Sequence, residues 1–472
     1  MTTYDLIAIG GGTAGLVTAA GGAGLGARVA LVERDRLGGE CLWTGCVPSK
    51  ALLACARAAA DARRAERLGV HASEVRVDFA GVMRWVHEAQ RRIAPHDSPD
   101  RFRGLGVDVV EGSARFVDER TVDVGGRRLS AKRIVIATGS RPSLPPIEGL
   151  AGVPYLTNET IFTIDQQPSA LLILGAGPIG LELAQAFARL GTAVTVVEQE
   201  STFLPREDAE VAGLLAEALR EDGVDLRLGV AVTSARVDGR GLVLACRSAS
   251  GAPEELRAEA LLVAAGRTSR TEELGLERAG VATAGGDVSV DDHLRTTADG
   301  IGAAGDVAGG LRFTHVADYE ARLVLRNALF PLAARRDYSA VPWVTFTDPE
   351  LAHVGLTERE ARDRHGDRVD VWRRSFHDVD RAIADGATAG LVKLVTDRRG
   401  KILGGHILGH AAGTMISEIT LAMRRGLSVG QVAAVIHPYP TYSEAVRQAA
   451  ELRLKARFTG PARRLARWFA RR

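Results

Sequence analysis

A chain of 472 residues is too long for a single hydrophobic core and indicates roughly three domains. With 46% hydrophobic and 25% charged residues, its composition is that of an ordinary globular protein, and the formal net charge of +2 argues against nucleic acid as a partner. No apolar run reaches the length of a membrane span and the N-terminus resembles no secretory leader, so we expect a cytoplasmic protein.

The chain opens with a nucleotide-binding pattern. Residues 4–9 predict a short apolar strand, a glycine-rich turn and a helical run follow, and the next predicted strand ends at the acid Glu33. The glycines of the G-x-G-x-x-G spacing are Gly10, Gly12 and Gly15. They permit a tight turn, the close approach of a pyrophosphate, and close packing of the helix on the strand, while the acid can accept hydrogen bonds from a ribose. A plain glycine-rich turn is the alternative, but the order of these features favours a dinucleotide.

Two cysteines five residues apart follow within residues 38–50. Five residues turn a regular helix by roughly 140°, so a disulfide between Cys41 and Cys46 needs a distorted turn, which Gly45 permits. Pro48 is suited to the first position of a helix, which would place Cys46 beside the positive end of a helix dipole and lower its thiol pKa. A zinc site would need further ligands nearby, and an inert thiol pair leaves the glycines and the proline without a role. We predict a redox-active disulfide.

The nucleotide pattern recurs after the cysteine pair. Its glycines are Gly175, Gly177 and Gly180. In both copies the acid lies 23 residues after the first glycine, from Gly10 to Glu33 and from Gly175 to Glu198. Two nucleotide sites with a redox pair between them predict FAD at the first and a nicotinamide nucleotide at the second. A carboxylate accepts from a ribose 2′-hydroxyl and repels a 2′-phosphate, so Glu198 favours NADH, whereas Arg206 keeps NADPH open.

The cysteine stretch resembles the active-site signature of the class I pyridine nucleotide-disulfide oxidoreductases, which include dihydrolipoamide dehydrogenases, glutathione reductases and mercuric reductases. It departs from that signature at Glu40, Trp43 and Thr44. The resemblance extends over nearly the whole chain and is strongest to the mercuric reductase-like and dihydrolipoamide dehydrogenase-like members. It implies an FAD-dependent, NAD(P)H-dependent reductase in which Cys46 lies against the flavin and Cys41 meets the substrate.

Further residues match motifs of this family. Lys50 and Glu182 match an ion pair beside the flavin, where a fixed positive charge would stabilise the reduced cofactor. An ordinary helix–helix salt bridge is the alternative, although it would be unusual if buried. Gly139 and Gly266 fall in the two segments where the chain crosses between the nucleotide domains. Asp306 matches an acid that hydrogen-bonds the ribityl chain of FAD, although a turn or cap aspartate would look the same.

The resemblance also implies an architecture. The fold class would be α/β, with two Rossmann-like domains for FAD and NAD(P) followed by an α+β C-terminal dimerisation domain. The expected divisions are a discontinuous FAD-binding domain at residues 1–148 and 285–338, an NAD(P)-binding domain at 149–284, an interface domain at 339–456 and a basic amphipathic tail at 457–472. The working enzyme would be a homodimer whose active site is shared between the subunits.

The C-terminal motif decides which acceptor the sequence favours. In relatives, a histidine base and a glutamate five residues later reach the cysteine pair of the opposite subunit. Here Tyr439 lies five residues before Glu444, and His437 lies seven before it. The base position is therefore filled by a tyrosine, as in mercuric reductases, although a small backbone shift would bring the imidazole of His437 to the cysteines. A tyrosine keeps its proton near pH 7, so we expect a metal ion or another non-disulfide acceptor. The C-terminal cysteine pair of mercuric reductases has no counterpart after Cys246.

Two alternatives stay open at this stage. The protein could instead be a dihydrolipoamide dehydrogenase or other disulfide reductase, or an electron-transfer flavoprotein that reduces quinones without its cysteines. The tail at residues 461–472 carries five arginines and no acid, with Leu465, Trp468 and Phe469 at helical spacing. A solvated or dimer-docked helix is the simpler interpretation, and peripheral contact with an anionic membrane surface is the other.

Overall fold

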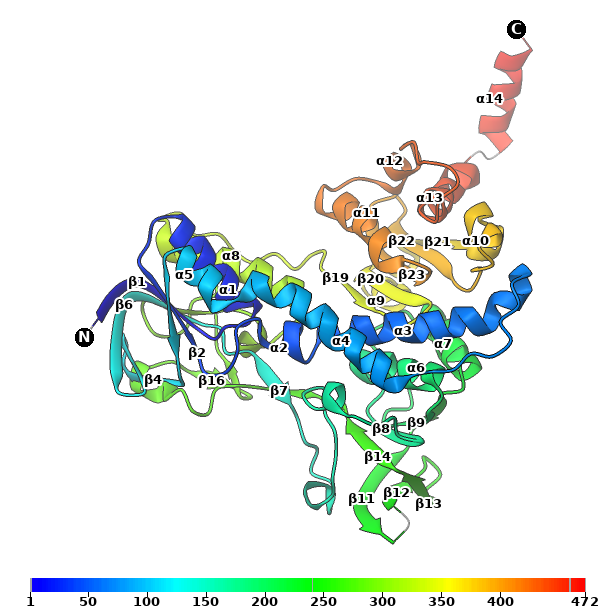
Figure 1. Ribbon diagram of the computed structural model, residues 1–472. Coiled ribbons are helices and arrows are strands. Elements are labelled where there is room, and N and C mark those ends of the chain that lie inside the picture. The colour runs from blue at the N-terminus through cyan, green and yellow to red at the C-terminus, as the bar shows by residue number, and fades with distance from the viewer. Residues whose placement is uncertain (1, 240, 458–459, 472) are drawn as a thin grey trace.

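The computed structural model describes residues 2–239, 241–457 and 460–471. In these residues the chain forms three lobes, each built around a principal sheet of its own (Figure 1). The first two lobes have mainly parallel principal sheets with helices packed on them, and the third has an antiparallel sheet. The predicted α/β class, with two Rossmann-like lobes and an α+β C-terminal lobe, is confirmed.

The first lobe holds a sheet in the order β3-β2-β1-β6-β5-β4, and β18 pairs with β6. Its strands are β1 (Thr2–Ile9), β2 (Val29–Glu33), β3 (Val107–Glu111), β4 (Ala114–Asp118), β5 (Thr121–Val124), β6 (Arg127–Ile136) and β18 (Ile301–Ala303). Its helices are α1 (Thr13–Gly24), α2 (Gly39–Trp43), α3 (Cys46–Arg64), α4 (Phe79–Ile93), α5 (Pro99–Gly104) and α8 (Thr314–Leu329). Because β18 follows the second lobe in the chain, the first lobe is discontinuous; the boundary residues 148 and 285 stay predictions.

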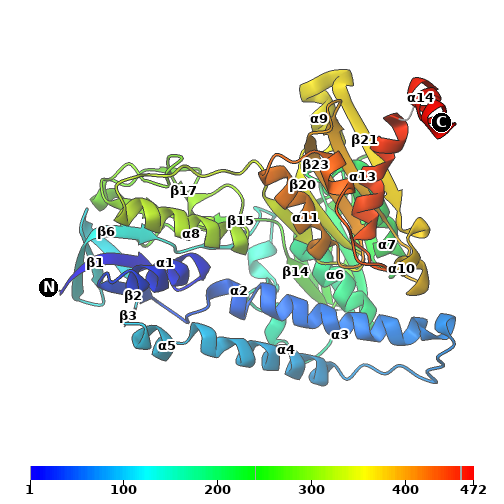
Figure 2. The same cartoon turned by 90° about the horizontal axis from the view of Figure 1, so that it is seen from above.

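Helices α1 and α8 lie side by side on the first sheet (Figure 2). A β-carbon at Gly21 of α1 would lie 2.6 Å from a methyl group of Leu325 on α8, so the missing side chain lets the two helices approach. Both helices follow parallel strands, α1 after β1 and α8 after β18. They therefore begin at the same edge of the sheet, where parallel α/β sheets bind their ligands.

The second lobe repeats the parallel arrangement, in the order β10-β9-β8-β14, beside an antiparallel sheet of β11-β12-β13. Its strands are β8 (Ala170–Leu174), β9 (Ala193–Glu198), β10 (Asp225–Leu228), β11 (Ala231–Asp238), β12 (Gly241–Arg247), β13 (Pro253–Ala258) and β14 (Ala260–Val263), and its helices are α6 (Pro178–Leu190) and α7 (Ala209–Glu221). The predicted range for this domain, residues 149–284, ends inside a short hairpin: β16 (Thr283–Ala284) lies within the range, and its partner β17 (Asp287–Val288) lies beyond it.

The two crossing segments between these lobes lie against each other. Strand β7 (Ser140–Pro142) pairs antiparallel with β15 (Arg267–Ser269). The glycine before each strand has a left-handed backbone, with φ of 70° at Gly139 and 120° at Gly266. Residues with a β-carbon are strained in this conformation, so the glycines permit the sharp change of direction at each crossing.

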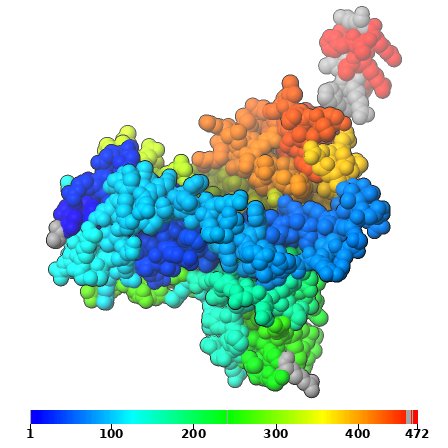
Figure 3. Space-filling view, in the orientation of Figure 1, coloured from blue at the N-terminus to red at the C-terminus, as the bar shows by residue number. Residues whose placement is uncertain are grey.

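The third lobe follows residue 341 and carries the sheet β19-β20-β23-β22-β21. Its strands are β19 (Pro342–Thr345), β20 (Glu350–Gly355), β21 (Val369–Ser375), β22 (Leu391–Asp397) and β23 (Ile402–Gly409), and its helices are α9 (Glu358–His365), α10 (Asp380–Ala384), α11 (Ala412–Arg424), α12 (Val429–Ala433) and α13 (Glu444–Arg457). Helix α14 (Gly460–Ala470) stands away from the body of the molecule (Figure 3). Within the described part of the chain, no helix is both long and apolar enough to cross a membrane.

Helix α3 joins the first lobe to the second. It begins at the cysteine stretch and runs along the lower side of the molecule beside α4, where it also packs against α6 (Figure 2). Leu52 and Ala56 of α3 share a buried core cluster with Leu183 and Phe187 of α6. This packing fixes the start of α3, and therefore Cys46, relative to the second nucleotide loop.

Candidate active site

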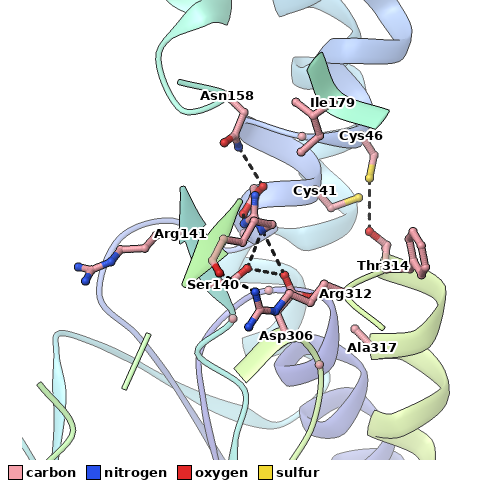
Figure 4. A pocket seen from close by; sticks show the side chains of 18 of the residues that line it. Cys41, Cys46, Ser140, Arg141, Asn158, Ile179, Asp306, Arg312, Thr314 and Ala317 are labelled. Atoms are coloured by element: carbon pink, nitrogen blue, oxygen red, sulfur yellow. Dashed lines mark hydrogen bonds and ion pairs between the residues drawn. The ribbon is translucent and has the colours of Figure 1, made fainter. Parts of the chain in front are cut away.

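A cleft of about 1810 Å³ opens where the three lobes meet. Both glycine loops line it, as do the cysteine stretch, the start of α8 and part of β19. Residues from five segments of the chain therefore face one space. Figure 4 shows part of its wall, with Cys41 and Cys46 above Ser140 and Asp306.

The two glycine loops are near copies of each other. The first glycines, Gly10 and Gly175, have φ of 113° and 108°. A β-carbon on the third glycine would lie 1.7 Å from the carbonyl oxygen of Gly10 in the first loop, and 2.2 Å from that of Gly175 in the second. No side chain fits at Gly15 or Gly180, because the helix packs directly on the preceding turn. The first glycine makes the turn and the third allows the packing.

The second glycines differ from these because they face open space. A β-carbon on Gly12 would meet only the Cα of Gly39, at 4.0 Å, and one on Gly177 would meet nothing within 4 Å. Each is the residue just before a helix, α1 or α6, where free backbone N–H groups and the helix dipole favour a phosphate. The loops therefore fit the pyrophosphate of FAD and of a nicotinamide nucleotide, and a β-carbon at either glycine would enter that space.

The acid at the end of the second strand of each lobe accepts a hydrogen bond from the backbone of the glycine loop. Glu33 accepts hydrogen bonds from the N–H of Gly11 and, at 2.8 Å, from that of Asp35. Glu198 accepts from the N–H of Ala176 at 2.9 Å and of Glu200 at 3.0 Å. Both carboxylates line the cleft at the end of a parallel strand, which is where a ribose is bound in this arrangement. Arg206 also lines the cleft.

The two cysteines lie on consecutive helices, α2 and α3, which are separated by residues 44 and 45. Cys41 is inside α2, and Cys46 is the first residue of α3, with Gly45 as its N-cap. The predicted position of Pro48 was wrong: it is the third residue of α3, not the first. Proline is tolerated there because the N–H groups of the first turn have no partner within the helix. Cys46 is therefore the first residue of the helix, at the positive end of its dipole, rather than two residues before the helix begins.

The two thiols, both reduced, have opposite pKa shifts. The hydrogen bond from Cys41 lowers the pKa of the Cys46 thiol to about 6; contact with Thr314 and the charge of Lys50 act in the same direction, against burial and Glu182. The pKa of Cys41 is raised, first by its hydrogen bond to Cys46 and then by burial. The reduced pair therefore carries its negative charge on Cys46 near neutral pH and keeps a proton on Cys41.

The predicted ion pair is present beside the cysteines. The Nζ of Lys50 lies 2.7 Å from Oε2 of Glu182, and the other oxygen of this buried carboxylate accepts from the N–H of Phe346 at 2.9 Å. The Lys50 ammonium also lies 4.5 Å from the centre of the Phe346 ring. The ammonium is held by the carboxylate and the aromatic ring, and the carboxylate is held in turn by the backbone N–H, so the pair is fixed in position and presents a constant field to the cleft.

A polar network below the cysteines was missed by the sequence analysis. Asp306 accepts from Ser140 at 2.5 Å, and Ser140 in turn accepts from Nε of Arg267 at 2.8 Å. Arg267 also forms an ion pair with Glu40, which accepts from Asn158 at 2.9 Å. Burial raises the pKa of Glu40, while Arg267 opposes that effect. One signal was available: an acid next to Cys41 departs from the family signature, and a carboxylate in a cleft needs a cation nearby.

In the single chain, the residues of the C-terminal motif contact side chains of the third lobe. The hydroxyl of Tyr439 donates to Asp380 at 2.9 Å, and Nε2 of His437 lies 2.9 Å from Glu418. Glu444, the first residue of α13, is paired with Arg447 of its own helix at 3.2 Å. Glu444 is also close enough to Tyr439 for its charge to contribute, after Asp380, to the raised pKa of that phenol, and the role of the two residues at the partner's cysteines stays a prediction.

Comparison with known proteins identifies the family. Residues 4–321 match the family described as pyridine nucleotide-disulphide oxidoreductase, and residues 341–450 match the dimerisation domain of pyridine nucleotide-disulphide oxidoreductases. The chain belongs to this family. It is an FAD-dependent, NAD(P)H-dependent oxidoreductase, as predicted, and the second match fits the predicted homodimer.

Three relatives show which members of the family this pyridine nucleotide-disulphide oxidoreductase is similar to. A mercuric reductase of Streptomyces lividans is 40% identical over 458 residues, covering 95% of this chain and 96% of the relative. A dihydrolipoyl dehydrogenase of Haloarcula marismortui is 37% identical over 458 residues, with the same coverage. The Cu(II) complex of the HOCl-induced flavoprotein disulfide reductase RclA from Escherichia coli superimposes with a TM-score of 0.85 at 31% identity, covering 96% of this chain and all of the other. Identity alone does not separate a metal acceptor from a disulfide.

Proposed function

We propose that this oxidoreductase is mercuric reductase-like: it passes electrons from NAD(P)H through Cys41 and Cys46 to a soft metal ion or a similar electrophile. The observation that carries the proposal is the reduced pair itself, with a thiolate on Cys46 and a protonated thiol on Cys41 in the cleft between the two nucleotide loops. The conversion of the two thiols to a disulfide gives two electrons to the acceptor and releases the remaining proton.

Each part of the cleft has a role in this reaction. FAD, when bound, carries electrons from NAD(P)H to the cysteine pair. The Gly12 and Gly177 loops would hold the pyrophosphates of the two nucleotides, and Asp306 would orient the ribityl chain. Lys50, fixed by Glu182, supplies a positive charge that favours the reduced cofactor. Cys46 lies on the cofactor side of the pair, and Cys41 meets the acceptor.

The side chain at the base position favours an acceptor that needs no proton transfer. The hydrogen bond to Asp380 raises the pKa of Tyr439, so its phenol keeps its proton at neutral pH. Dithiol–disulfide exchange moves a proton with each thiol that attacks or leaves, and a group that titrates near pH 7 does this best. Electron transfer from thiolates to a metal ion does not require such a base, so Tyr439 is better suited to metal reduction.

His437 is poorly placed to act instead. Its Nδ1 faces the carbonyl oxygen of Val435 at 3.0 Å and its Nε2 faces Glu418 at 2.9 Å, so both ring nitrogens already have an oxygen acceptor. The side chain is only 5% exposed. To serve as a base it would have to give up one of these contacts and turn that nitrogen towards the partner subunit. We therefore assign it a structural role in the segment that carries Tyr439.

The homodimer would bring Tyr439 of each subunit to the cysteines of its partner. The surface around Tyr439 supports this, because it exposes apolar side chains that a solvated face rarely gathers. They are Ile383, Leu421, Val435 and Ile436. Ile436 is 95% exposed in the single chain. No comparison supports a membrane contact of the tail, and this contact, the preference for NADH and the cytoplasmic location stay predictions.

The acceptor can be tested with a matched set of variants. NADH oxidation by the parent, Tyr439→His, Tyr439→Phe and His437→Ala is measured with Hg(II), Cu(II), lipoamide and a quinone. We expect the parent to be faster with a metal ion than with lipoamide, His437→Ala to change little, and Tyr439→His to gain about tenfold or more with lipoamide. Fast lipoamide turnover by the parent, abolished in His437→Ala and untouched in Tyr439→Phe, would contradict the assignment. Quinone turnover that survives Cys41→Ser, with no metal turnover, would support an electron-transfer flavoprotein instead.

A further inference from the structure

The sulfur of Cys46 has a neighbour that neither the motifs nor the proposed function uses. Oγ1 of Thr314 lies 3.3 Å from Sγ of Cys46, within hydrogen-bonding distance for sulfur (Figure 4). Thr314 is the first residue of α8 and Cys46 is the first residue of α3. The positive ends of two helix dipoles therefore meet at one sulfur atom, with a hydroxyl group between them.

The groups that face this sulfur come from four helices. Cys41 of α2 and Thr314 of α8 offer hydrogen-bond donors, while Lys50 of α3 and Glu182 of α6 carry charges. Lys50 is paired with Glu182, so the carboxylate offsets part of the effect of the ammonium at the sulfur. His315, which follows Thr314, faces the carbonyl oxygen of Pro342 at 2.8 Å, and burial lowers its pKa, so it adds no charge near neutral pH.

This arrangement treats the two sulfurs unequally. Cys46 is at a helix N-terminus and its sulfur lies 3.3 Å from the Thr314 hydroxyl, whereas Cys41 is inside the short helix α2. The hydroxyl also lowers the pKa of Cys41, but the hydrogen bond to Cys46 and burial outweigh that effect there. A hydroxyl has one proton and can donate it to one thiolate at a time. A donor fixed on α8 at Cys46 therefore favours negative charge on that sulfur over the other.

We propose that Thr314 is a positioning residue that holds the charge of the reduced pair on Cys46 by donating its hydroxyl proton to that sulfur. Cys41 then stays protonated until the acceptor arrives. The inference rests on the proposed function in one respect, because it takes Cys46 as the thiol on the cofactor side. It adds a residue from α8, 268 positions along the chain, to the machinery of the cysteine pair.

The test is a pH titration of the long-wavelength absorbance that a Cys46 thiolate gives beside oxidised FAD in the two-electron-reduced holoenzyme. Thr314→Val removes the donor with little change of shape, Thr314→Ser keeps it, and Ser49→Ala is the matched control. Ser49 donates to the carbonyl oxygen of Cys46 and accepts from Nζ of Lys50 at 3.3 Å, and neither hydrogen bond involves the sulfur. We expect Thr314→Val to raise the midpoint by about one pH unit, and Thr314→Ser and Ser49→Ala to leave it within a few tenths.

An unchanged midpoint in Thr314→Val would overturn the inference while leaving the proposed function standing. A parent without the band, or a band that persists in Cys46→Ser, would overturn the proposed function and this inference with it. If Thr314→Val does not retain FAD, the pH dependence of iodoacetamide labelling at Cys46 in the reduced apoproteins, mapped by mass spectrometry, answers the same question. The same shift of about one unit supports the inference, and coincident profiles overturn it.

Discussion

A methyl group at Gly177 tests how the second loop meets its nucleotide. The residue has φ of −76° and ψ of 173°, which any residue adopts, and the added β-carbon would meet nothing within 4 Å. The loss of stability should be about 1 kcal/mol or less, the difference between glycine and alanine before a helix. If the pyrophosphate lies against this backbone, the methyl displaces it from one or two charge-assisted hydrogen bonds. That loss corresponds to a rise of about tenfold to 100-fold in KM for NADH.

The assay compares KM for NADH with the Tm of the holoenzyme in three variants. Gly177→Ala should raise KM with a Tm close to that of the parent. Gly180→Ala should lower Tm strongly, because its β-carbon would lie 2.2 Å from a backbone carbonyl oxygen. Gly213→Ala, which adds the same methyl to open space on α7, should change neither kinetics nor FAD content. A parent-like KM in Gly177→Ala would refute the reasoning that this loop holds the pyrophosphate.

Three further predictions concern charged groups in the cleft. Glu198→Arg should shift kcat/KM towards NADPH by about tenfold or more, and an unchanged ratio of the two nucleotides would mean that the carboxylate does not touch the ribose. Glu40→Gln should lower the Tm by about 2 °C, because Arg267 loses a charged acceptor; a Tm equal to that of the parent would show that the pair adds nothing. Since the pKa of Cys46 is lowered to about 6, its thiolate is present above that pH and lost as the pH falls through it. Alkylation of the reduced thiols should therefore slow below pH 6, and slowing already near ~8.5 would contradict the shift.

The sequence predicts those parts of the molecule that depend on neighbouring residues. The strand predicted at residues 4–9 lies within β1 (Thr2–Ile9), and both glycine loops follow their strands as expected. These features are local, because a buried strand or a turn that admits only glycine can be recognised from residues that are adjacent in the sequence. Lys50 and Glu182 could be paired only through the family resemblance, since they lie 132 residues apart.

Contacts between distant segments had no such signal. Glu40 and Arg267 are 227 residues apart, and Cys46 and Thr314 are 268 apart. Spacing along the chain cannot show that α2 and β15, or α3 and α8, meet across the cleft. The C-terminal motif presents a different problem, because the motif itself is local but the partners of its residues are not. Its register assigns the base position to Tyr439, which stays a prediction, and the partners of Tyr439 and His437 come from α10 and α11, which the motif does not include.

The most direct test of the central claim is an anaerobic titration of the oxidised holoenzyme with dithionite. If Cys41 and Cys46 form the redox-active pair, the parent should take up two electron pairs per subunit, one for FAD and one for the disulfide. Cys41→Ser and Cys46→Ser should each take up one pair and lose turnover with the metal acceptor. Uptake of a single pair by the parent, or full metal turnover in Cys41→Ser, would contradict electron flow through these cysteines.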